Sequence, residues 1–195
     1  MDRIRSGVSR REVIENYARY DLLKKHPDST VPDFAEWDWT TADAIDDQMS
    51  QARLKVGVPA GYILWDEVSI TCDDLRQCAI HNAINEALGT TMRRLGDLEV
   101  YGYLGRWSPP SERAWFTSIV SGKVPDDTGP ILLRPAVKCE YPASWYVEDG
   151  SGRATAFIKF AGRFDPSVPL ARGFLGTAID RNSKFMYLHF RELYI

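Results

Sequence analysis

The chain contains 195 residues, of which 44% are hydrophobic, and carries a formal net charge of −3. This length allows one domain, or one domain with a sizeable extension, to bury a core, and the lack of basic excess argues against a protein dedicated to nucleic-acid binding. No apolar run approaches the length needed to span a bilayer, and the N-terminal segment lacks the continuous apolar stretch of a signal peptide. The odd number of cysteines, three in all, fits reduced thiols. We therefore expect a cytoplasmic protein with no membrane partner.

The first part of the chain shows mainly helical patterns. A helix is predicted to begin after Ser9 and to end at Pro27, with an apolar face that contains Val13. An acidic, proline-containing connection over residues 26–39 separates it from a second helix, which is expected to end near Gly57. The stretch GYILWDEVSI that follows is typical of a strand.

A long helix is predicted next. Thr71, followed three residues later by Asp74, resembles a capping box, and apolar residues recur at helical spacing through about Leu95. Residues 1–96 are therefore expected to form a mainly helical region packed on the core of the second part of the chain. This region is where a DNA or protein partner would bind.

Two groups of side chains in this region allow more than one interpretation. Cys72, Cys78 and His81 are metal-ligating residues close in sequence, but their spacing is not that of a standard zinc site. A buried thiol beside a polar neighbour explains them as well. Tryptophans in polar surroundings, as in EWDWTT, are typical of core and interface packing, and stacking on a nucleobase is the alternative.

From residue 97 short β-runs alternate with turns. LEVYGYLG, GPILLRPAV and SWYVED are typical of strands, PSERAWFTSIVSG contains a helix, and a last helix begins at about Ser151. The runs VPLARGFLGTAID and KFMYLHFREL complete the chain. The pattern predicts an α+β fold in which a mixed-sheet domain, residues 97–195, follows the helical region 1–96.

The turn EDGSGRATA, where a strand passes into a helix, is the candidate site. A helix N-terminus presents backbone N–H groups and a partial positive charge, and glycine allows an anion to approach the backbone closely. Gly150 and Gly152 would permit that approach. Ser151 and Thr155 supply hydroxyl donors, and the guanidinium of Arg153 would bind phosphate oxygens in a fork.

Two carboxylates lie at the start of this turn. Glu148 and Asp149 are candidate ligands for Mg²⁺ or for a ribose hydroxyl, because hard cations prefer carboxylate oxygens. The alternative is a plain strand-to-helix turn, in which Asp149 caps the helix, the glycines relieve backbone strain and Arg153 is solvated at the surface.

Two segments together resemble the ParB N-terminal-like domain of the ParB/sulfiredoxin superfamily. SIVSGKVPDDTGPILLRP, residues 118–135, is similar to a helix with a Ser-Ile and Gly element that leads into a Pro-Ile-hydrophobic strand with an Arg, here Arg134. DGSGRATA is similar to a second box, in which a Gly turn and an Arg, here Arg153, open a helix of small residues. The similarity extends over about residues 98–180.

The resemblance implies a small mixed-sheet fold that binds a nucleotide, ATP or CTP, with its phosphates on the Gly-x-x-Arg helix terminus. The residues expected to contact the nucleotide are Arg134, Gly150, Ser151, Gly152, Arg153, Ala154 and Thr155. Mg²⁺ is assigned to Glu148 and Asp149, and catalysis to these two residues together with Arg153.

The sequence departs from two branches of this superfamily. Sulfiredoxin chemistry needs a Cys immediately after the motif glycine, where this chain has Ser151. The chromosome-partitioning clamps carry an acidic-Arg-Arg run and a downstream helix-turn-helix domain, which this sequence does not show. We therefore expect neither the reductase activity nor a partitioning role.

Three functions stay open. The first is an enzyme that carries out Mg²⁺-dependent phosphoryl transfer or nucleotide hydrolysis at the turn. The second, which the resemblance includes, is a plasmid-type fertility-inhibition factor with ATPase and DNase activity. The third is a regulatory protein that binds a partner through residues 1–95 without catalysis.

Two further segments are secondary candidates. GRWSPPSER carries Arg106, Glu112 and Arg113, which would lie near the nucleotide or form a surface loop with a helix cap. DPSVPLARGFLG carries Arg172 and Gly173, in a loop over the site or in an ordinary strand connection. The three histidines have no Ser or Cys partner at a familiar catalytic spacing, so a hydrolase triad has no support.

Overall fold

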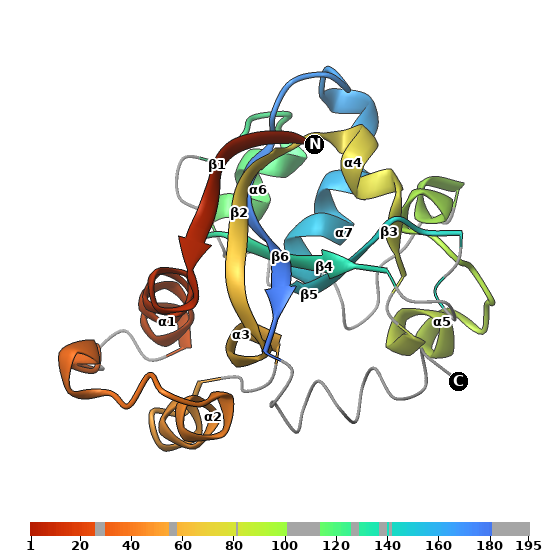
Figure 1. The fold of residues 1–195 in the computed structure, drawn as a ribbon. Coiled ribbons are helices and arrows are strands. Elements are labelled where there is room, and N and C mark those ends of the chain that lie inside the picture. The colour runs from red at the N-terminus through yellow and green to blue at the C-terminus, as the bar shows by residue number, and fades with distance from the viewer. Residues whose placement is uncertain are drawn as a thin grey trace. The chain divides into compact units, whose positions relative to one another are not determined.

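The fold was obtained as a computed structural model, which describes residues 1–25, 30–54, 58–80, 82–100, 114–125, 129–136, 140 and 142–180 (Figure 1). The strands are β1 (Asp2–Ser9), β2 (Tyr62–Ile70), β3 (Cys78–Ala79), β4 (Ile131–Pro135), β5 (Trp145–Asp149) and β6 (Ala171–Ile179). The α-helices are α1 (Arg10–Lys25), α2 (Ala42–Gln51), α3 (Val58–Gly61), α4 (Cys72–Arg76), α5 (Asn82–Leu88), α6 (Ala114–Val120) and α7 (Ser151–Lys159). Short 3₁₀ helices are η1 (Phe34–Glu36), η2 (Leu95–Val100) and η5 (Ala161–Arg163).

The strands form one sheet in the order β1-β2-β6-β4-β5-β3. β4 pairs antiparallel with β5 and parallel with β6, and β3 pairs parallel with β5. Helices and a mixed sheet together confirm the predicted α+β class. The strands expected at GPILLRP and SWYVED, and the helix expected at Ser151, are where the sequence predicted them.

The chain divides into two compact units. Unit 1 consists of Met1–Ile4 and Glu67–Leu175, and unit 2 of Arg5–Asp66 and Gly176–Ile195. The boundaries between the units therefore fall inside β1, β2 and β6 and not near residue 96, where the change of sequence texture placed the division. The region 1–96, predicted to be mainly helical, contains the strands β1, β2 and β3 as well as helices.

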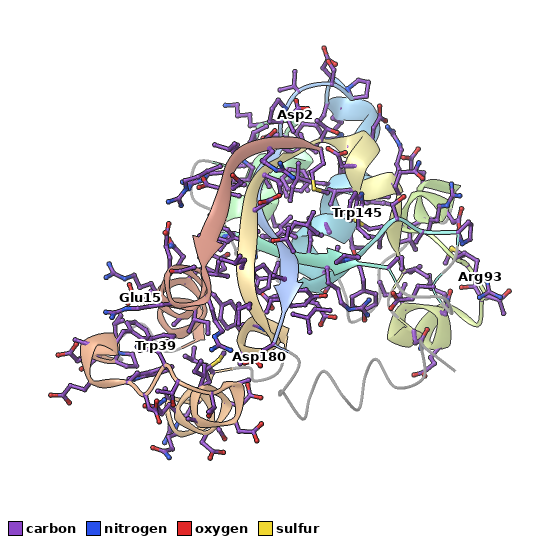
Figure 2. All side chains as sticks on the ribbon, viewed as in Figure 1. Asp2, Glu15, Trp39, Arg93, Trp145 and Asp180 are labelled. Carbon is purple, nitrogen blue, oxygen red and sulfur yellow. The ribbon has the colours of Figure 1, made fainter. Side chains whose placement is uncertain are left out.

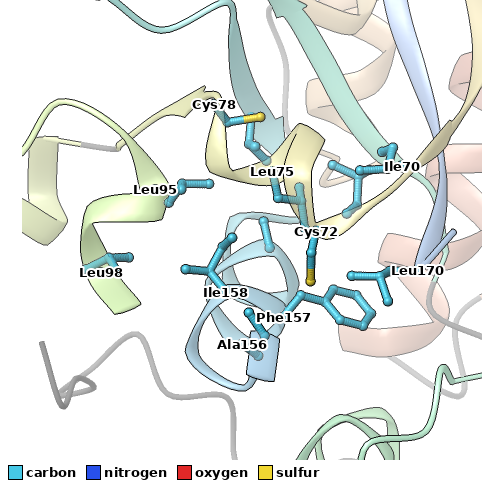
Figure 3. Close-up of a cluster of buried hydrophobic side chains, with 14 of the residues drawn as sticks. Ile70, Cys72, Leu75, Cys78, Leu95, Leu98, Ala156, Phe157, Ile158 and Leu170 are labelled. Carbon is cyan, nitrogen blue, oxygen red and sulfur yellow. The ribbon is translucent and has the colours of Figure 1, made fainter. Parts of the chain in front are cut away.

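Unit 1 is built around a cluster of buried apolar side chains (Figure 3). Six consecutive residues of α7, Arg153–Ile158, are buried, which covers every side of a helix with 3.6 residues per turn. Figure 3 shows Phe157 and Ile158 of this helix beside Cys72 and Leu75 of α4. The middle of α7 is therefore enclosed by its own unit. At the N-terminal end of the helix, Ser151 and Gly152 are partly exposed.

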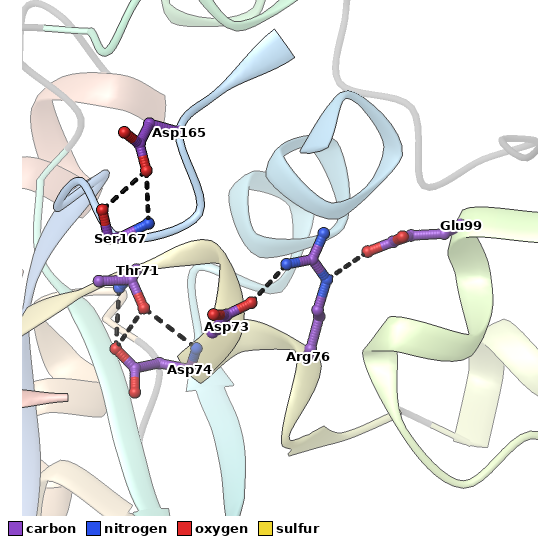
Figure 4. A network of polar contacts seen from close by, with 7 residues as sticks. All are labelled: Thr71, Asp73, Asp74, Arg76, Glu99, Asp165 and Ser167. Carbon is purple, nitrogen blue, oxygen red and sulfur yellow. Dashed lines mark hydrogen bonds and ion pairs between the residues drawn. The ribbon is translucent and has the colours of Figure 1, made fainter. Parts of the chain in front are cut away.

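The long helix predicted over residues 71–95 is wrong. The capping box at its start is present: the Thr71 hydroxyl accepts from the backbone N–H of Asp74, and the Asp74 carboxylate accepts from the backbone N–H of Thr71 (Figure 4). The helix it opens, α4, nevertheless ends at Arg76. Cys78, Ala79 and Ile80 are consecutive and at most 5% exposed. The residues after α4 instead form β3 at the edge of the sheet, where Cys78 and Ala79 pair with Trp145 and Tyr146 of β5.

A second expected element also differs. LEVYGYLG was predicted to be a strand, but its first three residues, Leu98 to Val100, belong to the 3₁₀ helix η2. Leu98 is 1% exposed and belongs to the core of unit 1. The remainder of that stretch lies outside the described residues.

Unit 2 contains the predicted first helix, α1, whose start is capped by Ser9: its hydroxyl accepts from the backbone N–H of Glu12 at 3.2 Å. Arg10 donates to the backbone carbonyl of Ala60 at 2.8 Å and pairs with Asp180 at 3.1 Å. These partly buried contacts join α1 to α3 and to the residue that follows β6 within the unit.

The aromatic residues of EWDW pack on protein in this structure. The rings of Trp37 and Trp39 are stacked with centroids 5.5 Å apart, and the guanidinium of Arg11 lies 5.6 Å from the Trp39 ring. Figure 2 labels Trp39 among the side chains. Phe34 meets Trp37 edge-on, with ring centroids 5.0 Å apart.

Among the described residues, no helix is long and apolar enough to cross a membrane.

Candidate functional site

The turn from β5 to α7, residues 149–152, is the candidate site. Gly150 is the N-cap residue of α7 with φ of 87°, a left-handed conformation that favours glycine. Its carbonyl accepts the N–H of Ala154 at 2.9 Å, but no side chain caps the helix. Asp149 therefore does not have the capping role that the structural alternative gave it. The first N–H groups of α7 lack the side-chain acceptor that usually occupies such an end.

The two glycines of the turn have different surroundings. A Cβ on Gly150 would lie 3.0 Å from Nη2 of Arg153 and 3.1 Å from Cγ1 of Ile131. A Cβ on Gly152 would meet no atom within 4 Å, and the backbone there needs no positive φ. Packing and conformation therefore require a glycine at Gly150 and do not require one at Gly152. Glycine stabilises a helix less than alanine does, so helix propensity does not explain the glycine at residue 152 any more than packing does.

Arg153 is 3% exposed and is not the solvated residue of the structural alternative. Its Nη1 donates to the backbone carbonyl of Gly129, and its Nη2 donates to the carbonyl of Pro130 at 3.1 Å. Nη2 also lies 3.9 Å from the Asp149 carboxylate. The guanidinium thus joins the segment before β4 to the first turn of α7, a contact that the sequence did not indicate.

Three other predicted residues lie on the same helix. Ser151 is partly exposed at the helix start, while Ala154 and Thr155 are at most 1% exposed. The Thr155 hydroxyl is buried with no hydrogen-bond partner among the described residues. Ser151 and Thr155 are four residues apart, which places them on one face of the helix, and helical side chains tilt toward the N-terminus. Because most buried polar groups form a hydrogen bond, the Thr155 hydroxyl is a candidate to bond a group that the described residues do not supply.

Arg134, predicted to contact the nucleotide, is buried in a network of ion pairs. It is 7% exposed, forms two hydrogen bonds of 2.7 Å with Glu140, and donates through Nε to Glu148. Its guanidinium lies 4.2 Å from the Tyr146 ring. Burial opposes its charge, but the hydrogen bonds to Glu140 and the charge of Glu148 outweigh that effect and raise the pKa of Arg134. Burial also raises the pKa of Tyr146 to about 12.

The two carboxylates assigned to Mg²⁺ do not converge. Glu148 and Asp149 are neighbours on β5, at the point where the pairing register with β4 shifts by one residue. Their side chains have different partners: Glu148 pairs with Arg134, and Asp149 lies 3.9 Å from Arg153. In the described part of the chain, no group of three or more His, Cys, Asp or Glu side chains is arranged to hold a metal ion. The pair therefore does not fit the metal site that the sequence suggested.

The cysteines considered for a metal site lie in the core. Cys72 and Cys78 are each 0% exposed, and burial raises the pKa of Cys72 to about 11 and that of Cys78 to about 12. The Cys78 thiol contacts the Asp74 carbonyl at 3.6 Å. Both residues are thus protonated thiols packed among apolar side chains, as the alternative interpretation proposed.

The secondary candidates fall in different places. Arg172 and Gly173 lie in β6, where the Arg172 side chain is 70% exposed and pairs with the buried Glu67 carboxylate. They form part of the sheet and not a loop. The candidates that lie outside the described residues are Arg106, Glu112, Arg113, His26, His81 and His189.

Comparisons with family models, with curated proteins and with solved structures found no match to this chain. The site is therefore defined by its own geometry: an enclosed helix whose N-terminal turn is uncapped, next to a glycine that the fold does not require.

Proposed function

We propose that the N-terminal turn of α7 binds the phosphates of a nucleotide, ATP or CTP. One observation carries this proposal: at Gly152, no atom of the described residues outside its own turn lies within 4 Å of the position that a Cβ would take. Because no side-chain cap is present among the described residues either, we infer that the N–H groups and the helix dipole are available to an oxyanion. The ParB/sulfiredoxin resemblance, which places phosphates at the same turn, supports the proposal without establishing it.

The residues present fit a phosphate group in a further respect. The Thr155 hydroxyl is an orphaned buried donor one helical turn below Ser151. Backbone N–H groups of residues 151 and 152, with the Ser151 hydroxyl, would hold the oxyanion. A nucleotide bound at this turn would supply the electrophilic phosphorus atom for phosphoryl transfer.

The two carboxylates expected to take part in catalysis contact arginines. Mg²⁺-dependent phosphoryl transfer or hydrolysis was expected to use both Glu148 and Asp149, but Glu148 is bound to Arg134. We therefore propose nucleotide binding as the function and keep turnover, and with it the fertility-inhibition role, as a prediction. A partner at residues 1–95 also stays a prediction, as does a cytoplasmic location.

Replacing Gly152 by Val tests the proposal. The new side chain has room, and Val and Gly differ little in helix propensity, so the fold should persist. It would nevertheless fill the space that the phosphate needs. We expect the Kd for ATP or CTP, measured by calorimetry with and without Mg²⁺, to rise about tenfold or more, the loss of one or more charge-assisted hydrogen bonds.

Gly162→Val is the matched control. Gly162 lies in η5, has no positive φ, and a Cβ there would also meet nothing within 4 Å, but it is distant from the start of α7 in the chain. This variant should bind nucleotide as the parent does. The proposal fails if the parent binds neither nucleotide, or if Gly152→Val and Gly162→Val bind with the same affinity as the parent.

A further inference from the structure

The position of Arg153 is inconsistent with a direct role in phosphate binding. Its side chain is 3% exposed, and its two terminal nitrogens donate to the backbone carbonyls of Gly129 and Pro130. A guanidinium that turned toward a ligand would lose both of these part-buried hydrogen bonds, and the loss of hydrogen bonds to a charged group is costly. The planar fork of an arginine fits two successive carbonyls, a geometry that a point charge does not reproduce.

The same guanidinium determines which residue can occupy position 150. Nη2 lies 3.0 Å from the place of a Gly150 Cβ, and the Ile131 side chain closes the space at 3.1 Å. Gly150 is left-handed and supplies the carbonyl that accepts the first hydrogen bond of α7. The contacts of Arg153 with Gly150 and with the start of β4 therefore restrain all three. Together they determine the path of the backbone at residues 150–152.

We propose that Arg153 is a positioning residue. It holds the segment Gly129–Pro130 against the first turn of α7, and so keeps the N–H groups of Ser151 and Gly152 in place to bind phosphate without touching the phosphate itself. This inference rests on the proposed function for the existence of the phosphate site. It assigns the two glycines separate roles, Gly150 in the Arg153 contact and Gly152 in ligand access.

Nuclear magnetic resonance of the full-length, ¹⁵N-labelled protein tests this directly. On addition of ATP, the amide signals of Ser151 and Gly152 should shift, while the guanidinium signals of Arg153 should not. A guanidinium shift as large as that of the Gly152 amide would identify Arg153 as a direct ligand and would overturn the inference.

Two variants provide the second arm of the test. Arg153→Ala should speed hydrogen exchange of the Ala154 amide, which is bonded to Gly150, and weaken ATP binding, each about tenfold or more. Arg153→Lys retains the charge and serves if the alanine variant does not fold. A lysine binds phosphate well as a point charge, but its single nitrogen does not reproduce the planar fork in which two nitrogens each donate to one carbonyl, so we expect it to lose affinity as alanine does.

The outcomes separate the two proposals. If Arg153→Lys retains the parent affinity, or Arg153→Ala leaves the exchange of Ala154 unchanged, the positioning role is wrong. If ATP shifts neither Ser151 nor Gly152 in the parent, the proposed function fails. The exchange rate of Ala154 is measured without nucleotide, so in that case it still decides whether Arg153 holds the turn.

Discussion

Single residues decide how closely the strands of unit 1 approach. Gly173 in β6 lies opposite Ile131 of β4, and a Cβ at this position would lie 2.8 Å from the Ile131 carbonyl oxygen and 2.4 Å from Cδ1 of Ile70. The sequence suggested a loop at this glycine, because a glycine in a strand and a glycine in a loop look alike when the neighbouring strands are unknown. The requirement comes from tertiary packing that no local pattern shows.

Gly173→Ala should therefore destabilise the protein. The isoleucine side chain can move, but the carbonyl oxygen belongs to the backbone of a buried strand, so the strands must shift. Overpacking of this kind costs about 1 to 3 kcal/mol. The measurement is the urea midpoint of unfolding. Gly162→Ala, at a glycine with open surroundings, should leave the midpoint nearly unchanged. Equal midpoints for Gly173→Ala and the parent would show that β6 and β4 are not packed as described.

At the scale of the element, local signals predicted where helices begin better than where they end. The Thr71 and Asp74 pattern correctly located the start of α4, since a capping box depends only on residues three apart. The end of α4 depends on the pairing of Cys78 with Trp145, far away in the sequence. Figure 4 shows the capping box and, beside it, Arg76, which donates to Asp73 within α4 and to Glu99 of η2. The contact with Glu99 joins α4 to η2.

The capping box predicts a dependence of stability on pH. Burial alone would raise the pKa of Asp74, but the hydrogen bonds it accepts from the Met1 amine and from Thr71 lower it below its ordinary value. A carboxyl whose pKa is lower in the folded state stabilises the fold above its unfolded pKa of about 4. This stabilisation is lost as the pH falls through the folded pKa.

Asp74→Asn should thus reduce the free energy of unfolding at about pH 7 and have less effect at acid pH, where the parent carboxyl is protonated as well. Urea unfolding of both proteins across this pH range measures the difference. Thr71→Ala removes the N-cap hydroxyl, which also donates to the Asp74 carboxylate at 2.8 Å, so it should cost about 1 kcal/mol at about pH 7 and less at acid pH. A difference between Asp74→Asn and the parent that does not shrink as pH falls would contradict this assignment.

At the scale of the whole molecule, the sequence predicted the fold class and the elements that carry the candidate site. An α+β fold, the strands β4 and β5 and the start of α7 follow from local hydrophobic patterns and turn residues. The division into units could not be predicted, because each unit combines segments far apart in the chain. For the same reason the sequence indicated which residues to consider for the candidate site but not their contacts. Arg153 donates to the carbonyls of Gly129 and Pro130, and Arg134 pairs with Glu140.

The central claim is that α7 binds phosphate through its backbone. A crystal structure of the protein with ATP or CTP tests it most directly. We predict a phosphate oxygen within hydrogen-bond distance of the N–H groups of Ser151 and Gly152, with Arg153 still bonded to Gly129 and Pro130. A nucleotide bound elsewhere, or an Arg153 side chain turned onto the phosphate, would contradict the account.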